Sequence, residues 1–246
     1  MIIEHLYPQA AYLYGDPYNI RILRLSRPEA TVIETKLGES PAFTTRDDVD
    51  LVYLGSMTEV AQQDIAAALL PFKARFDELI AAGKHFLFTG NALDLVGEQV
   101  NNPDMGYEFT GLGLFPFATT LRMLARIHDR MLAVSDGLPL VGYRSTFSHH
   151  TLLGTGRGGN TNWEFAHVVR GSGLTVGLGE GVRRAGFIAT EIIGPLLITN
   201  PLFTKRLLSE IGGGDAPLAY ESALVAAYEA RLAEFRDPHR WSGKGH

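Results

Sequence analysis

The chain has 246 residues, 46% hydrophobic and 20% charged, which allows one α/β domain with a substantial core or two small ones. A net charge of −5 and the lack of a basic stripe argue against a nucleic-acid partner. There is no cysteine, which excludes disulfides and thiolate metal sites, and no apolar run approaches the roughly 20 residues that span a bilayer.

We expect a cytoplasmic protein. Met1 to His5 has neither the basic start nor the long apolar stretch of a secretory signal. The absence of cysteine fits a reducing compartment as well.

Short apolar runs alternate with helical patterns in the first part of the chain, which is typical of a mostly parallel sheet covered by helices. Ile2 to Leu6 is predicted as the first strand, and Asn19 to Leu25 has the spacing of a helix. Strands are then expected at Ala30 to Thr35 and at Leu51 to Leu54, where the chain runs into a turn.

The longest predicted helix runs from Glu59 to Ala82, with its apolar residues on one face and Gly83 as its C-cap. Pro71 is expected to kink this helix or divide it in two. The next strand, His85 to Phe88, has the apolar character of a parallel strand that is buried on both faces.

From about residue 106 to 189, short strands between glycine-rich turns predict an antiparallel or mixed extension of the sheet. Residues 154–160 contain Gly-x-Gly-x-Gly, but no apolar helix opens after them, so we interpret them as a mobile loop and not a phosphate cradle. Further predictions are a helix at Pro201 to Ile211, a glycine hinge at 212–214, an amphipathic helix at Ala219 to Phe235 and a disordered end at 237–246. We therefore expect one α/β domain over residues 1–213 and a C-terminal helix with a polar tail over 214–246.

Three stretches of the sequence resemble one enzyme family. The first is His5-Leu6-Tyr7-Pro8 with Leu13-Tyr14-Gly15-Asp16 and Asn19-Ile20. The second is the segment Thr89 to Gly97, which we predict to form a sharp turn and a helix start after the buried strand. The third is Gly194-Pro195-Leu196-Leu197 with Asn200-Pro201. Together they resemble the GatD branch of the cobyric-acid-synthase-like (CobB/CobQ-like) class I glutamine amidotransferases, over roughly residues 1 to 211.

The resemblance implies a class I glutamine-amidotransferase-like, flavodoxin-like α/β fold with a mostly parallel sheet and flanking helices. It also implies a partner, because GatD is a glutaminase subunit that works with the Mur-ligase-like protein MurT to amidate lipid II in peptidoglycan synthesis. We therefore consider a Mur-ligase-like (MurT-like) subunit as a possible partner. No cofactor is implied.

The residues that carry the family's chemistry are missing. Aligned on Gly97, Gly90 stands at the position of the nucleophilic cysteine, and Ile193 stands where the family has a histidine base. The glycine-rich oxyanion loop is reduced to Gly55-Ser56-Met57. Because neither Gly90 nor Ile193 can attack a carbon or accept a proton, we expect a catalytically degenerate homologue that acts by binding.

Parallel strands deliver their carboxyl ends to one edge of a sheet, so the altered positions should lie around one shared concavity. We expect this concavity to hold a small-molecule ligand or a loop of a partner. Its predicted lining residues are Gly55, Ser56, Met57, Gly90, Asn91, Asp94, His150, Glu191 and Ile193.

The alternative is an active amidotransferase, or another hydrolase, that uses a different nucleophile. Thr89 points away from position 90, and its candidate base His85 lies about 13 Å back along an extended strand. Ser56 lies in the right loop, but the sequence identifies no base for it.

His149, His150, His167 and Glu164 offer side chains that could in principle bind a metal. Adjacent histidines in a strand point to opposite faces, so at most one of the pair could join His167. We therefore expect solvated or loop histidines and no metal.

Overall fold

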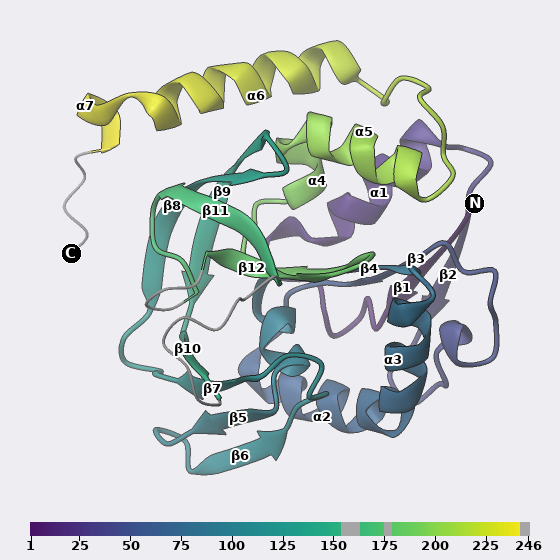
Figure 1. The fold of residues 1–246 in the computed structure, drawn as a ribbon, viewed down its shortest axis with the longest axis vertical. Helices are drawn as coiled ribbons and strands as arrows, with labels where there is room; N and C mark the ends of the chain where they lie inside the picture. The colour runs from purple at the N-terminus through teal and green to yellow at the C-terminus, as the bar shows by residue number, and fades with distance from the viewer. Residues whose placement is uncertain (154–162, 175–178, 242–246) are drawn as a thin grey trace.

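A computed structural model describes residues 1–153, 163–174 and 179–241 of the chain. A nine-stranded sheet runs through the molecule with helices on both of its faces, and a smaller four-stranded sheet lies below one end of it (Figure 1). The glycine-rich segment 154–160 lies outside the described residues, so its interpretation as a mobile loop stays a prediction.

One half of the large sheet is parallel, in the order β2-β1-β3-β4-β13. Its central strand, β4, is buried over nearly its whole length because helices cover both faces of the sheet. The strands are β1 (Ile2–Leu6), β2 (Thr31–Thr35), β3 (Leu51–Leu54), β4 (His85–Thr89) and β13 (Phe187–Thr190).

The other half, β12-β11-β8-β9, is antiparallel and continues the sheet from β13. This is the extension that the glycine-rich turns predict. The strands are β8 (Ile127–Ser135), β9 (Leu138–Thr146), β11 (Glu164–Arg170) and β12 (Glu180–Arg184).

The four-stranded sheet, in the order β10-β7-β5-β6, is a separate unit that the sequence patterns do not distinguish from the main extension. Strand β5 pairs in parallel with β7, while the outer pairs are antiparallel. The strands are β5 (Gln99–Asn102), β6 (Tyr107–Thr110), β7 (Phe117–Leu121) and β10 (Ser148–Leu152).

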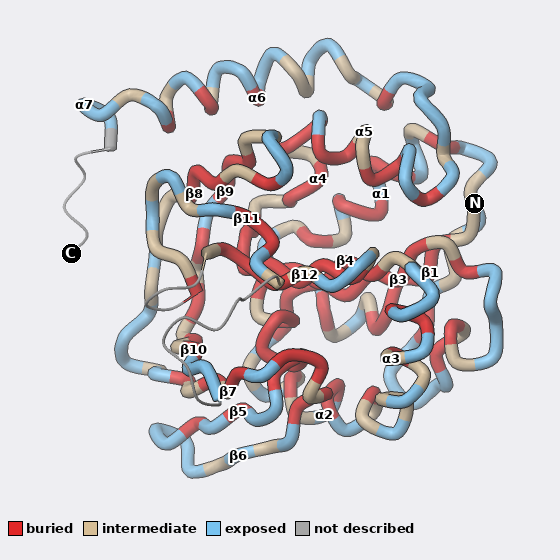
Figure 2. Tube along the Cα trace, viewed as in Figure 1, coloured by how far each residue is buried: buried red, intermediate tan, exposed pale blue. Residues whose placement is uncertain are grey.

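Helices α1, α4 and α5 cover one face of the large sheet, and α2 and α3 cover the other (Figure 1). Each face therefore has its own apolar core, and the buried stretches of Figure 2 follow the strands and the inner sides of these helices. The helices are α1 (Pro17–Ser26), α2 (Glu59–Leu69), α3 (Lys73–Ala81), α4 (Leu196–Thr199) and α5 (Pro201–Glu210), with short 3₁₀ turns η1 (Leu13–Gly15), η2 (Ala42–Thr44), η3 (Leu70–Phe72) and η4 (Gly90–Val96).

Pro71 divides the predicted long helix into α2 and α3. Proline has no amide hydrogen and its ring clashes with the preceding turn, so the α-helical bonding stops at Leu69 and a 3₁₀ turn joins the two helices. Gly83 ends α3 with a φ of +78°, a conformation that glycine adopts without strain.

The C-terminal part consists of α6 (Glu221–Arg236) and α7 (Pro238–Trp241), which lie over α4, α5 and the β8–β9 hairpin (Figure 1). Helix α6 is exposed along most of its length and buries only Tyr228, Leu232 and Phe235. The sequence predicts disorder from residue 237, but residues 238–241 form a helical turn. The side chain of Asp237 caps the start of this turn by accepting the amide of His239. None of the helices in the described part of the chain is long and apolar enough to cross a membrane.

Candidate functional site

Gly90 lies at the sharp turn that follows β4, where the resemblance places the nucleophile. We call this turn, Thr89 to Asn91, the elbow. The φ of Gly90 is +61°, a left-handed conformation that side chains rarely adopt. A Cβ atom at this position would overlap the Ser56 Oγ and lie 2.8 Å from Ser56 Cβ and 3.3 Å from Ile193 Cγ2. The space beside the elbow is therefore already filled.

The atom that fills it belongs to a buried network around Asp16. The Asp16 Oδ2 accepts the amide of Ser56 at 2.5 Å, its hydroxyl at 2.6 Å and the hydroxyl of Thr89 at 2.9 Å. Asn19 and Tyr53 join the network, since the Asn19 side-chain amide donates to the Tyr53 hydroxyl at 2.8 Å. All five side chains are buried, so the region has the character of a polar core and not of an open cleft.

Burial raises the pKa of Asp16 above its ordinary value, although the hydrogen bonds from Ser56, Thr89 and Asn19 oppose that shift. These donors compensate for the loss of water around the carboxyl group. Asp16 reaches the site from the loop before α1. This loop packs so closely against Gly55 that it leaves no room for a side chain there. A Cβ at Gly55 would lie 2.9 Å from the carbonyl oxygen of Ala11 and 3.0 Å from Asp16 Cβ.

The amides of the expected oxyanion loop are also occupied. The Ser56 amide donates to Asp16, and the Met57 amide donates to the Asn91 Oδ1 at 2.9 Å. The Asn91 side chain in turn donates to the Met57 carbonyl at 2.8 Å, which clamps the loop to the elbow. An oxyanion hole needs amides that point at open space, and these two do not.

The elbow does not lead into an α-helix, which corrects the expected helix start at Thr89 to Gly97. Residues Gly90–Val96 form the 3₁₀ turn η4, and the carbonyls at its end bond to another segment instead of continuing into an α-helix. The carbonyls of Leu95, Val96 and Gly97 accept amides of residues 112–115, which turns the chain into β5. The helix N-terminus that would favour a thiolate in an active enzyme is therefore missing.

Asp94 lies in η4 and is the centre of a second buried cluster. One of its oxygens accepts from His150 Nε2 at 2.8 Å and from the Thr119 hydroxyl at 3.4 Å. The other accepts from the Ser148 hydroxyl at 2.6 Å and from the Gln62 side chain at 2.9 Å. Burial alone would lower the pKa of His150, but the bond to Asp94 and the charges of Glu191 and Asp94 outweigh it and raise that pKa.

Glu191 is not free to act as a base, because it forms a fully buried ion pair with Arg144. Arg144 also donates to the carbonyl of Gly173 at 2.6 Å. Beside this pair, Glu180 accepts the amide of Glu191 at 2.8 Å. Burial and then the charge of Glu191 raise the pKa of Glu180 to about 7.

Asp94, His150 and Glu191 each place one potential metal-ligand atom within 4.8 Å of the others. Asp94 already accepts four hydrogen bonds from protein donors. Glu191 is paired with the charge of Arg144, but neither of its buried carboxylate oxygens has a hydrogen-bond donor among the described residues. Of the residues considered for a metal from the sequence, His167 Nδ1 lies 3.9 Å from Glu164 Oε1 in β11. His150 does not join them, because its ring bonds to Asp94.

The structure brings together the altered positions that the resemblance singles out. Ser56, Gly90 and Ile193 meet at the elbow, and Asn91 joins them to Met57. Ile193 is held there by a backbone bridge to Tyr143, with its amide 2.9 Å from the Tyr143 carbonyl. All nine predicted residues except the half-buried Asn91 are buried, so their role as the lining of a ligand site stays a prediction.

Sequence reasoning missed Asp16 and Arg144. Asp16 is 40 positions from Ser56 and 73 from Thr89, so no local pattern links them. The available signal was the position of Asp16 in the stretch Leu13-Tyr14-Gly15-Asp16, which carries the resemblance. Arg144 stands in the middle of β9, where a charged residue that faces the interior predicts a buried partner.

No protein-family model matches the sequence, and no curated protein is significantly similar to it. Solved structures do share its fold. A chain of PurLQS from Thermotoga maritima aligns with a TM-score of 0.54 and 13% identity, over 94% of this chain and 98% of that one.

Two glutamine amidotransferases align comparably. One has a TM-score of 0.52 and 12% identity, over 85% of this chain and 98% of the other. The second, from Thermotoga maritima, has a TM-score of 0.51 and 9% identity, over 95% and 98%. The predicted α/β fold, with a mainly parallel central sheet flanked by helices as in class I glutamine amidotransferases, is therefore confirmed, and identities this low establish the fold alone.

Proposed function

We propose that this chain is a glutamine-amidotransferase-like protein that does not hydrolyse glutamine and acts by binding. The observation that carries the proposal is the closed elbow at Gly90, where the Ser56 side chain, held by Asp16, occupies the nucleophile's place. Glutaminases of this type form a thioester, and the chain has no cysteine to form one.

Three further features also support the proposed inactivity. Ile193 has no lone pair with which to accept a proton, and the amides of Ser56 and Met57 are already donated to side chains. The turn after Gly90 is a 3₁₀ segment, so it offers no helix dipole to a thiolate. Repairing any one of these positions would leave the others unchanged.

The test is glutamine turnover by the purified protein, measured as ammonia release with and without a MurT-like protein. We expect no turnover. The variant Gly90→Cys with Ile193→His should also remain inactive, because loss of oxyanion donors typically costs about 10²–10³ in rate. Turnover by the wild type that survives repeated purification, or an ordinary enzymatic rate in the double variant, would refute the proposal.

We further propose that the binding partner is a Mur-ligase-like (MurT-like) protein, which would give the chain a role in peptidoglycan amidation. This rests on the resemblance of residues 5–20 and 194–201 to the GatD branch. Tyrosines 12, 14 and 18 in the same N-terminal stretch are 53%, 38% and 49% exposed, which suits a protein contact. A small-molecule ligand at the elbow is the other binding role that we consider.

Co-purification of the chain with a MurT-like protein from the same genome tests this partner. Tyr12→Ser with Tyr18→Ser should weaken the complex, whereas Tyr220→Ser, at an exposed tyrosine in the loop before α6, should leave it intact. A MurT-like protein that shows no association with the wild-type chain would refute the partner while leaving the loss of glutaminase activity untouched.

One observation favours the alternative, a hydrolase with a different nucleophile. The Ser56 hydroxyl donates to the Asp16 carboxylate at 2.6 Å, so Ser56 does have a potential base. Ser56 is completely buried, however, and a substrate could reach it only if the loop opened. Hydrolysis of activated esters by the wild type that disappears in Ser56→Ala would establish this alternative.

A further inference from the structure

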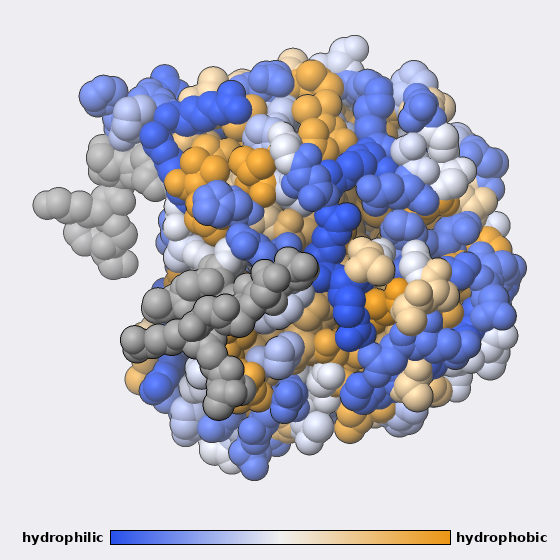
Figure 3. All heavy atoms as spheres, viewed as in Figure 1, coloured by the Kyte–Doolittle hydropathy of each residue, from blue (hydrophilic) through white to orange (hydrophobic). Residues whose placement is uncertain are grey.

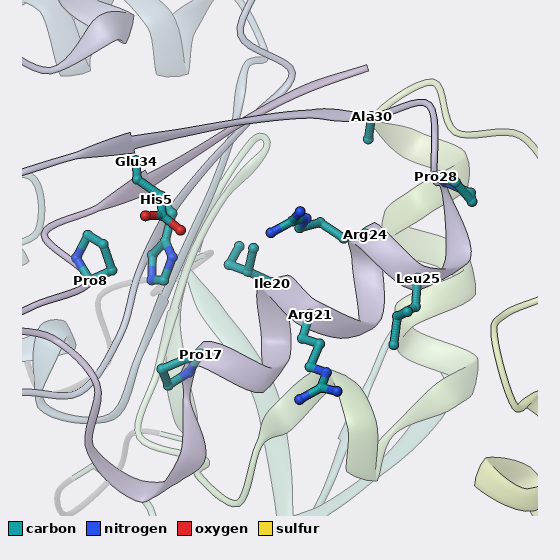
Figure 4. A pocket seen from close by; sticks show the side chains of 10 residues that line it. All are labelled: His5, Pro8, Pro17, Ile20, Arg21, Arg24, Leu25, Pro28, Ala30 and Glu34. Atoms are coloured by element: carbon teal, nitrogen blue, oxygen red, sulfur yellow. The ribbon is translucent and has the colours of Figure 1, made fainter.

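A surface pocket of about 620 Å³ lies away from the elbow, between α1 and the strands β1 and β2. Its walls combine apolar side chains, such as Ile20 and Leu25, with charged ones (Figure 4). The volume falls within the range of small-molecule sites, which are mostly apolar with a few placed polar groups.

The inner wall of the pocket contains His5 and Glu34, which are direct partners in the parallel pairing of β1 with β2. Because paired positions project to the same face of a sheet, both side chains face α1. Figure 4 shows them together on one side of the pocket. His5 is only 3% exposed, and its Nε2 atom has no hydrogen-bond partner among the described residues.

An unsatisfied buried nitrogen at a pocket wall is a place where a ligand can bond. Burial lowers the pKa of His5 to about 4, so its ring is neutral near pH 7 and one ring nitrogen donates while the other accepts. His5 can therefore contact a polar ligand group of either kind.

The opposite wall is formed by α1, from which Arg24 extends toward Glu34 and His5 (Figure 4). Within the described chain, the side chains of Arg24 and Glu34 form no ion pair or hydrogen bond with each other or with another residue. The pocket thus presents the cation of Arg24 and the anion of Glu34 on facing walls, neither of them neutralised by a described residue. Arg21, one turn earlier in α1, adds a second cation to the lining.

We propose that this pocket binds a small zwitterion with an apolar body, namely an amino acid or a dipeptide. The ligand carboxylate pairs with Arg24, a residue suited to planar carboxylates, and the ligand ammonium pairs with Glu34. The apolar side chain of the ligand packs on Ile20 and Leu25. The site does not depend on the proposed function, since none of these groups touches the elbow residues.

Calorimetric titration of the full-length protein with L-leucine and with L-leucyl-L-alanine tests the proposal and distinguishes the two ligand sizes. N-acetyl-L-leucine lacks the ammonium, and L-leucinamide lacks the carboxylate. We expect saturable binding of at least one zwitterion, and at least tenfold weaker binding of the two blocked compounds.

Arg24→Met and Glu34→Gln should each weaken binding of the zwitterion roughly tenfold. Both residues are exposed, so these variants are expected to fold. The matched control is Glu29→Gln, an exposed carboxylate close to Arg24 in the sequence that is not part of the pocket lining, and its affinity should equal that of the wild type. The proposal would be overturned if neither zwitterion bound, or if a blocked compound bound as tightly as the zwitterion.

Discussion

At the scale of single residues, the absence of a side chain at Gly90 determines which bonds the neighbouring Ser56 can form. With glycine at position 90, the Ser56 hydroxyl can turn into the space beside the turn and bond to Asp16. That bond, together with the one from the Ser56 amide, also removes an oxyanion donor. Ser56 therefore fills the space that a side chain at position 90 would need and, through the same carboxylate of Asp16, has its amide occupied.

Gly90→Ala is expected to destabilise the protein by about 2–5 kcal/mol. The left-handed backbone costs about 1–2 kcal/mol with a side chain, and overpacking against Ser56 adds about 1–3 kcal/mol. The control is Gly106→Ala, where φ is +72° but no atom lies within 4 Å of a new Cβ, so only the backbone cost applies. Urea unfolding measures both. Equal losses at the two positions would show that Ser56 does not crowd the elbow.

Glu180 should make the protein less stable as the pH rises. Its pKa is raised from 4.5 to about 7 by burial and by the charge of Glu191. Below pH 4.5 the group is protonated in both states. Between pH 4.5 and 7 the folded state keeps the proton that the unfolded chain releases, so the stabilisation is progressively lost as the pH passes through this window.

Glu180→Gln should remove this dependence, because the amide stays neutral. We expect the variant to gain stability relative to the wild type between pH 4.5 and 7, by at most about 3 kcal/mol. Unfolding curves at several pH values measure the difference. A difference that is constant with pH would mean that Glu180 titrates in the folded protein as it does in the unfolded chain.

At the scale of elements, local patterns predicted the parts whose structure depends on local sequence. The strands β1 to β4 follow from short apolar runs, and the break between α2 and α3 follows from Pro71 alone. The second sheet could not be predicted, because β5 pairs in parallel with β7 and β10 returns to β7 from a distance. Pairing between distant segments leaves no periodic signal within either one.

The candidate site divides in the same way. The meeting of Gly90, Ile193 and the Gly55–Met57 loop could be predicted because parallel strands end at one edge of the sheet. The partners of these residues could not, since the Asp16–Ser56 and Arg144–Glu191 pairs join segments of the chain that are 40 and 47 positions apart. Only the packed structure shows these bonds, which lie among the buried residues of the predicted site.

Arg27 joins two elements and should be needed to hold the connection between α5 and α6. Its guanidinium donates to the carbonyls of Ser26, Gly213, Gly214, Ala216 and Pro217. Arg27→Met leaves these oxygens without their donor, so we expect a loss of about 2–4 kcal/mol and faster amide exchange over residues 213–220.

Arg24→Met is the matched control for Arg27, because Arg24 is an exposed arginine in the last turn of α1, the helix that Arg27 directly follows. It should change the free energy of unfolding by less than about 0.5 kcal/mol. Exchange over residues 213–220 that stays slow in Arg27→Met would show that the apolar contacts of Leu218 are sufficient to hold this loop.

At the scale of the whole molecule, the C-terminal helix is less integrated than the rest. Two large apolar clusters fill the two faces of the main sheet, whereas Tyr228, Leu232 and Phe235 form a small third cluster with Leu132 and Val141. Figure 3 shows hydrophobic side chains gathered beneath the α7 end of α6, over the ends of β8, β9 and β11. The expected boundary near residue 213 stays a prediction, because the small cluster joins α6 to Leu132 and Val141 of the main sheet, and Leu218, Ala219 and Leu224 belong to one of the large clusters.

Tyr228→Ala with Phe235→Ala should therefore release α6 without unfolding the main domain. The two substitutions remove most of the apolar surface that this helix buries, and a helix of this length is marginal in water without packing. We expect amide exchange in residues 221–236 to become fast while β4 and β13 keep their protection, as in a locally unfolding unit. Ala230→Ser, on the exposed side of α6, should leave both regions protected. If exchange in β4 instead rises together with exchange in α6, the helix belongs to the same cooperative core as the central sheet, and the boundary near residue 213 is wrong.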